Sequence, residues 1–268
     1  MTLTITACTP YGIVPGADKR EFAMNGPRDA SKPLSNQVFL SYDDATKIVP
    51  IGSHAAMTIA GHLRGYLSIK SMISQVVKEK ERDGNIDVRE AAHWLHSKLS
   101  NYYSTGNNES GKLNFLSDYS KSVDPITLVI SGYKDKKSTS PETYYVTAPG
   151  AIEEIKGSII CSGQSHILER VITGLDPILR HKLLTEYNVQ KEYLERATQV
   201  FNYNFLPEKL TLEKATDFVA KIIQLTHLIG EVAKRDFDKE YLGEINPISY
   251  TLDIAKIEPG EGKGFKFL

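Results

Sequence analysis

Alternation of apolar and polar residues dominates the first part of the chain. Residues 3–14 are rich in Thr, Ile and Val, alternate like a half-buried strand and are interrupted by a Pro-Tyr-Gly turn. This pattern predicts a β-hairpin, followed by two more short strands over 47–51 and 55–61. Between them, residues 23–37 are polar and contain Asn-Gly-Pro and Ser-Lys-Pro, which predicts an inserted loop.

The pattern then changes to a helical period. Apolar residues recur every three to four positions over 62–80, and Asp87 with Glu90 three residues later forms the capping-box pattern that begins a second helix. Its predicted inner face consists of Ala91, Trp94, Leu95 and Leu99. Further along we expect strands over 127–133, 143–147 and 158–161, helices over 165–173, 190–201 and 211–234, and a strand pair within 248–257 before a Gly-rich tail.

Blocks of strands therefore alternate with pairs of helices. This order does not suit a parallel βαβ sheet, in which single strands alternate with single helices. Two antiparallel sheets packed face to face, each covered on its outer side by helices, satisfy the burial pattern. The fold class predicted is α+β, a four-layer α-β-β-α sandwich in one domain over 1–268, with the inserted loop at 23–37 and a helical addition around 174–210.

Composition describes an ordinary globular protein. The 268 residues carry a formal net charge of -1, with 41% hydrophobic and 24% charged residues. The near-neutral balance argues against a nucleic-acid partner. Cys8 and Cys161 have no metal-type spacing, and both are expected to be buried reduced thiols. We therefore expect no metal or other cofactor.

Targeting features are absent from the printed sequence. It has no signal-peptide pattern at its start and no apolar run near the ~20 residues that a membrane span requires. A cytoplasmic protein without a membrane partner is the expectation.

The start of the chain suggests chemistry. Met1 precedes Thr2, and removal of the methionine would leave a threonine with both a hydroxyl and a free α-amine. Such a pair is a minimal nucleophile–base unit, because an α-amine titrates near ~8 and can accept the hydroxyl proton at neutral pH.

Four motifs follow Thr2 in an order that resembles a known family. Gly12-Ile13-Val14 leads to Ala17-Asp18-Lys19-Arg20, then come Lys47-Ile48-Val49-Pro50-Ile51 and Met57-Thr58-Ile59-Ala60-Gly61. In motifs and spacing the chain resembles the proteasome β-type family of N-terminal-nucleophile hydrolases, which includes the HslV-type peptidase. The resemblance is clear over residues 2–61, extends to about Ile160 and is loose beyond.

The resemblance implies roles for individual residues. Thr2 would be the nucleophile, Lys47 would favour its alkoxide, Asp18 would orient Lys47, and the backbone N–H of Gly61 would donate to the oxyanion. Further site residues implied are Ser162, Ser165 and Asp236. An apolar pocket for the residue on the acyl side of the cut would be lined by Ala45, Val49, Ile59 and Leu63.

The chain also departs from the family pattern. The stretch from Asp18 to Lys47 is longer than usual, because it holds the polar loop. The Gly-Ser-Gly motif of active members is replaced by Cys161-Ser162-Gly163-Gln164-Ser165, so that the serine position falls on Ser162 or, without a gap, on Gly163. The Asp-x-x-Ser-Gly-Gly motif keeps only its acid, Asp236, and the later serine has no counterpart.

The function expected is a threonine peptidase that acts through an acyl-enzyme once methionine aminopeptidase has removed Met1. Family resemblance implies a homo-oligomeric ring, peptide or unfolded-protein substrates and an ATPase unfoldase partner. Two alternatives remain open at this point. One is a catalytically inactive structural homologue, and the other is an N-terminal-nucleophile amidase that acts on a small acyl amide.

Overall fold

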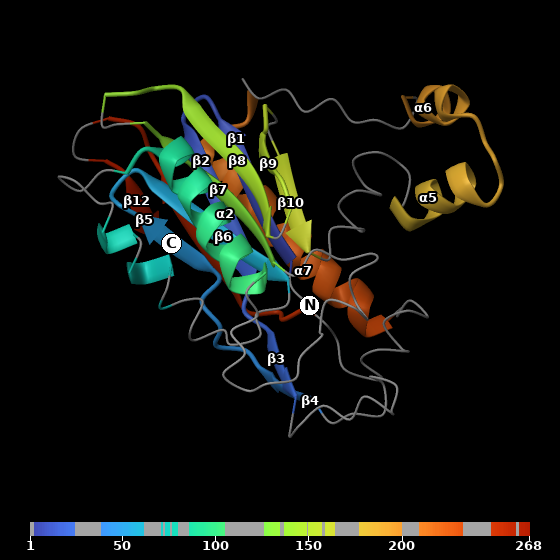
Figure 1. Ribbon diagram of the computed structural model, residues 1–268, viewed down its shortest axis with the longest axis horizontal. Coiled ribbons are helices and arrows are strands. Elements are labelled where there is room, and N and C mark those ends of the chain that lie inside the picture. The colour runs from blue at the N-terminus through green and yellow to red at the C-terminus, as the bar shows by residue number, and fades with distance from the viewer. Residues whose placement is uncertain are drawn as a thin grey trace.

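The computed structural model shows a mixed α+β chain with two five-stranded antiparallel sheets, one two-stranded sheet and several helices (Figure 1). It describes residues 3–24, 39–61, 71, 73–75, 77–79, 86–104, 126–134, 137–148, 150–156, 159–163, 177–199, 209–232, 248–260 and 263–268. The predicted α+β class and the two antiparallel sheets are confirmed.

The first sheet has the strand order β10-β1-β2-β11-β12. Its strands are β1 (Leu3–Thr9), β2 (Gly12–Asp18), β10 (Ile159–Gly163), β11 (Leu252–Ile257) and β12 (Phe265–Phe267). The predicted hairpin is confirmed, because β1 and β2 pair antiparallel from Thr4 opposite Ala17 to Thr9 opposite Gly12. Thr9 closes its turn by donating from Oγ1 to the Gly12 carbonyl at 2.9 Å and accepting from the Gly12 amide at 3.1 Å.

The second sheet has the strand order β5-β6-β7-β8-β9. Its strands are β5 (Ile48–Ile51), β6 (Ala55–Gly61), β7 (Ile126–Tyr133), β8 (Pro141–Ala148) and β9 (Ile152–Glu154). The strands predicted at 47–51, 55–61, 127–133 and 143–147 are thus confirmed within one or two residues, whereas β9 has no counterpart in the prediction.

Helix α7 (Leu212–Val232) packs on the first sheet. Its apolar face contacts the side chains of β1 and β2 that alternate toward it, and the whole cluster is buried. Contact is close at Gly16, where an added Cβ would lie 2.2 Å from Cγ1 of Val219. The glycine therefore permits the helix to approach the strand.

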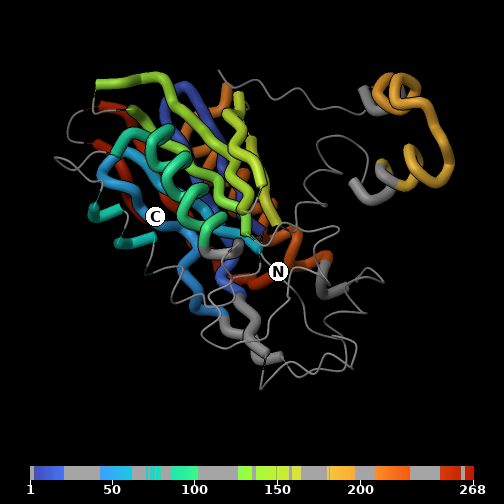
Figure 2. The backbone as a smooth tube through the Cα atoms, in the orientation of Figure 1, coloured from blue at the N-terminus to red at the C-terminus, as the bar shows by residue number. Residues whose placement is uncertain are grey.

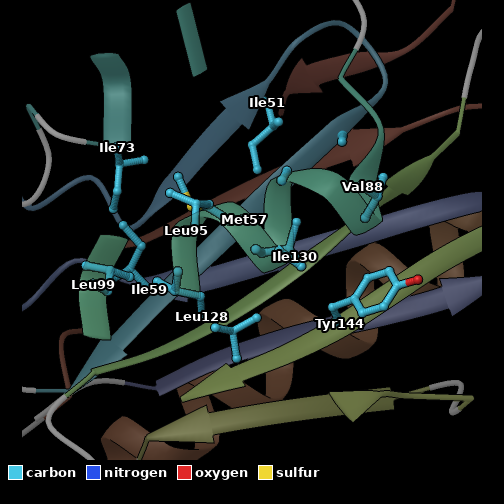
Figure 3. Packing of buried hydrophobic residues seen from close by; sticks show 14 of the residues in the cluster. Ile51, Met57, Ile59, Ile73, Val88, Leu95, Leu99, Leu128, Ile130 and Tyr144 are labelled. Atoms are coloured by element: carbon cyan, nitrogen blue, oxygen red, sulfur yellow. The ribbon is translucent and has the colours of Figure 1, made fainter. Parts of the chain in front are cut away.

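Helix α2 (Val88–Ser104) packs on the second sheet (Figure 3). Asp87 caps it as predicted, because its Oδ1 accepts a hydrogen bond of 3.0 Å from the Glu90 amide. The predicted inner face is confirmed for Ala91, Leu95 and Leu99, which are buried against Met57 and Ile130, while Trp94 packs at the edge of this cluster.

A third cluster lies between the two sheets. It includes Ile13 and Ile257 of the first sheet and Ile48, Ala56 and Tyr133 of the second. The sheets also meet through a hydrogen bond of 3.2 Å that Thr58 Oγ1 donates to Thr4 Oγ1. Helix, sheet, sheet and helix thus follow one another, and this packing is compatible with the predicted sandwich.

Other segments differ from the prediction. Short strands β3 (Glu21–Met24) and β4 (Phe39–Tyr42) pair with each other, so the predicted loop at 23–37 begins with strand residues, and its residues 25–37 lie outside the described part. The tail predicted to follow the last strand pair instead contains β12, which pairs with β11. The predicted helix at 165–173 lies outside the described residues.

The helical addition is present and contains α5 (Pro177–Thr185) and α6 (Lys191–Gln199). Both helices stand away from the two sheets (Figure 2). Within 62–80, the described residues 71, 73–75 and 77–79 are helical, and Ile73 is buried in the α2 cluster.

Candidate active site

Asp18 and Lys47 form a buried ion pair that joins the two sheets. Asp18 is the last residue of β2 and Lys47 immediately precedes β5. Lys47 Nζ lies 3.1 Å from both carboxylate oxygens of Asp18, and the residues are 0% and 3% exposed. The structure thus brings together the two residues that the sequence pairs, and their catalytic roles stay a prediction. Such a pair is costly to desolvate and needs further hydrogen bonds to hold it.

The Asp18 carboxylate receives those further bonds from the backbone. The Leu3 amide donates to Oδ1 at 2.7 Å, the Arg20 amide donates to Oδ2 at 3.0 Å and the Ser249 amide points to Oδ2 at 3.4 Å. These backbone donors supply the additional hydrogen bonds that a buried ion pair needs. Asp18 therefore ties together the start of β1, the segment that follows β2 and the segment before β11.

Lys47 is fixed by its backbone and by its ammonium group. Its carbonyl accepts a hydrogen bond of 3.0 Å from the Ile59 amide of β6, and its Nζ also donates to the carbonyl oxygen of Arg20. The ammonium is thus held by Asp18 and Arg20 in the interior, where a charge interacts more strongly than in water.

The proposed nucleophile, Thr2, lies outside the described residues, as do Leu63, Ser165 and Asp236. Thr2 is nevertheless joined by one peptide bond to Leu3, whose amide donates to Asp18. The buried ion pair is therefore anchored at the residue that follows Thr2.

Gly61 ends β6 opposite Ile126 and is exposed. Its φ of 107° belongs to the region that glycine adopts more readily than other residues. The role of its amide as a hydrogen-bond donor to an oxyanion stays a prediction.

The residues predicted to line a pocket are divided between two environments. Ile59 is 1% exposed and belongs to the cluster beneath α2, and Val49 packs against the same cluster. Ala45 is 5% exposed and its amide donates to the Lys19 carbonyl at 3.1 Å, beside the ion pair. The described residues thus bring Ala45 close to the Asp18 segment, while Val49 and Ile59 contribute to the helix-covered core.

Ser162 lies in β10 opposite Thr4, and Gly163 lies opposite Leu3. Paired residues of adjacent antiparallel strands point to the same face, so Ser162 shares with Thr4 the face that meets the second sheet. Ser162 is 2% exposed, and its hydroxyl has no hydrogen-bond partner within the described structure. The register thus places Gly163, not Ser162, beside Leu3.

Two residues near Asp18 were missed from the sequence. Ser249 is 1% exposed, and its hydroxyl lies 2.6 Å from Thr251 Oγ1 and accepts from the Thr251 amide at 3.0 Å. Asp43 accepts two hydrogen bonds of 2.7 Å from Arg20. The sequence Asn-Pro-Ile-Ser before β11 is typical of a turn and was the signal that could have pointed to Ser249. The sequence around Asp43 contains no comparable signal.

Several ionisable groups among the described residues have shifted pKa values. Hydrogen bonds from the Arg20 guanidinium lower the pKa of Asp43, with smaller contributions from that cation's charge, the Ser249 hydroxyl and His227. Burial raises the pKa of the Cys8 thiol despite a hydrogen bond to Thr143, and burial also raises the pKa of Tyr133. Both groups are therefore neutral at physiological pH.

The described part of the chain contains no group of three or more His, Cys, Asp or Glu side chains arranged to hold a metal ion. Within the same ranges, no helix is long and apolar enough to cross a membrane.

No protein-family model matches the chain, and no curated protein is significantly similar to it.

Proposed function

We propose that the chain is an N-terminal threonine peptidase of the proteasome β type. One observation carries the proposal: a single buried carboxylate, Asp18, binds both the amide of Leu3 and the ammonium of Lys47. By resemblance to the family, a lysine oriented by a carboxylate supports the N-terminal threonine, and this pair is anchored at the residue that follows Thr2. Most buried ion pairs are structural, so the position of this pair relative to Thr2 is what favours catalysis.

The chemistry would begin with attack of Thr2 Oγ on a carbonyl carbon. The α-amine freed by removal of Met1 would accept the hydroxyl proton and later return it to the leaving amine. The acyl–oxygen bond forms as the amide C–N bond breaks, and water then hydrolyses the ester to regenerate the threonine. No cofactor enters these steps.

Lys47 and Gly61 would stabilise the negative charges that develop on the Thr2 alkoxide and on the oxyanion during the reaction. The positive charge of Lys47 favours the alkoxide and disfavours protonation of the nearby amine. Asp18 keeps the ammonium in place without contacting substrate, so it acts as a positioning residue. One oxyanion donor such as the Gly61 amide typically contributes ~3 kcal/mol to transition-state stabilisation.

The packing of the chain supports the finer fold assignment. We assign the layers of α7, first sheet, second sheet and α2 to the four-layer sandwich of N-terminal-nucleophile hydrolases, in one domain. By resemblance to that family, we further propose assembly into a homo-oligomeric ring that acts on peptides or on chains unfolded by an ATPase partner.

Hydrolysis of fluorogenic peptide amides by the natively produced full chain tests this function. Wild type is expected to release the fluorophore, and Thr2→Ala is expected to lose that activity. Thr185→Ala, at the end of α5, is the matched control and should retain it. Wild type that forms rings yet cleaves no peptide or small acyl amide would contradict the proposal.

The second candidate is an inactive structural homologue. It is favoured by β10, in which Ser162 pairs with Thr4 and is buried between the sheets, while the position beside Leu3 is a glycine. This candidate predicts a folded, assembled protein without turnover, so the same assay separates the two.

A further inference from the structure

Residues 18–20 and 43–47 lie side by side through three contacts. Lys47 Nζ binds Asp18, the Ala45 amide donates to the Lys19 carbonyl, and Asp43 binds Arg20. The contacts involve alternate residues of segment 43–47 and consecutive residues of segment 18–20. The two segments are therefore joined by one row of contacts. The exposed Arg20–Asp43 pair lies at one end of this row, and the buried Asp18–Lys47 pair lies at the other.

Arg20 contacts both members of the buried pair through its backbone. Its amide donates to Asp18 Oδ2 at 3.0 Å and its carbonyl accepts from Lys47 Nζ. Its side chain makes a bidentate contact in which Nε and Nη2 each lie 2.7 Å from an oxygen of Asp43. A two-point contact of this kind fixes orientation as well as distance.

Ser249 lies on the other side of Asp18. Its amide points to Asp18 Oδ2 at 3.4 Å, and its side chain is among the groups that lower the pKa of Asp43. Thr251 donates from its amide to the Ser249 hydroxyl at 3.0 Å. Asp43 is thus joined through Arg20 to one of the three backbone donors that hold Asp18.

We infer that Asp43 is a positioning residue, which holds Arg20 so that the Arg20 backbone keeps Asp18 and Lys47 in place. The catalytic consequence rests on the proposed function, whereas the structural consequence does not. Among the described residues, the charges of Arg20 and of His227 on α7 act on Asp43, and Asp44 is its neighbour in the chain.

Asp43→Asn tests the inference, and Asp44→Asn is the matched control. Asp44 is exposed and adjacent, so its substitution removes the same charge without touching Arg20. Hydrogen exchange in the full chain, followed by mass spectrometry, measures the amide of Arg20. In Asp43→Asn we expect this amide to exchange roughly three- to tenfold faster, the factor that loss of a well-oriented ion pair implies. Amides within β7 should not change.

Covalent labelling of the N-terminal threonine by a peptide epoxyketone provides the functional readout. We expect Asp43→Asn to lower the maximal labelling rate with little change in the probe concentration for half-maximal rate, and Asp43→Glu to restore part of it. If Asp43→Asn and Asp44→Asn show equal amide exchange rates and equal maximal labelling rates, the inference is overturned. If wild type is not labelled at all, the proposed function fails, and the exchange experiment still decides the role of Asp43.

Discussion

The amide of Leu3 donates a hydrogen bond of 2.7 Å to a carboxylate oxygen of Asp18, the residue that also holds the ammonium of Lys47. This contact links the first described residue of the chain to a charge that is 0% exposed. Because Leu3 pairs with Gly163 of β10 and Thr4 pairs with Ala17 of β2, the ion pair and the start of β1 are held in one rigid frame.

Removal of one partner of the buried pair should be strongly destabilising. Lys47→Met leaves the Asp18 carboxylate buried and without its cation, and we expect a loss of about 3–5 kcal/mol in the free energy of unfolding. Urea unfolding followed by circular dichroism measures it. Lys221→Met, which removes an exposed pair with Asp217 on α7, should cost no more than about 1 kcal/mol. Similar losses in both variants would show that the buried pair is not held as described.

The contact between β2 and α7 can be tested at Gly16. A methyl group there would meet Val219 at 2.2 Å, so Gly16→Ala should lower the free energy of unfolding by about 1–3 kcal/mol through overpacking. Val219→Ala removes the clashing atom, and the double variant should therefore lose less than the sum of the single losses. If the double variant loses the full sum of the two single losses in the free energy of unfolding, measured by heat or urea, this packing is contradicted.

The Cys8 thiol should react slowly with alkylating reagents in the folded chain. Burial raises its pKa, and a raised pKa leaves less thiolate at a given pH. Iodoacetamide labelling near pH 8, read by peptide mass spectrometry, should modify Cys8 much faster in urea than in buffer. Equal rates in the two conditions would indicate that Cys8 is accessible.

The Asp43–Arg20 pair should make stability depend on acid pH. The pKa of Asp43 is lowered in the folded chain, so its contribution is fully present above the ordinary Asp value of about 3.9 and is lost as pH falls through the lowered value. Because Asp43 is 42% exposed, solvent screening limits that contribution to about 1 kcal/mol. Wild type and Asp43→Asn should differ in urea midpoint at pH 6 and converge at strongly acid pH. A difference that grows toward acid pH would have the wrong sign.

Sequence pattern predicted the strands of the two sheets well where alternation or a continuous apolar run was long, as in β1, β6 and β7. It missed β9 and β12 because each has three residues, and a short run with exposed positions gives no detectable period. Strands β3 and β4 were missed because both are short and β3 ends inside a stretch that composition assigns to a loop.

For the candidate site, spacing located Asp18 and Lys47 because both lie beside recognisable strands. Ser249 could not be found in the same way, since its backbone amide, not its side chain, faces Asp18 across 231 residues of sequence. Asp43 depends on the orientation of Arg20, and only the folded arrangement of the two segments reveals it.

Intact mass and peptide mapping of the natively produced chain after reaction with a peptide epoxyketone test the central claim most directly. The account predicts a chain shortened by Met1 that carries one probe on Thr2, with no adduct in Thr2→Ala. A chain that retains Met1, or an adduct on any residue other than Thr2, would contradict it.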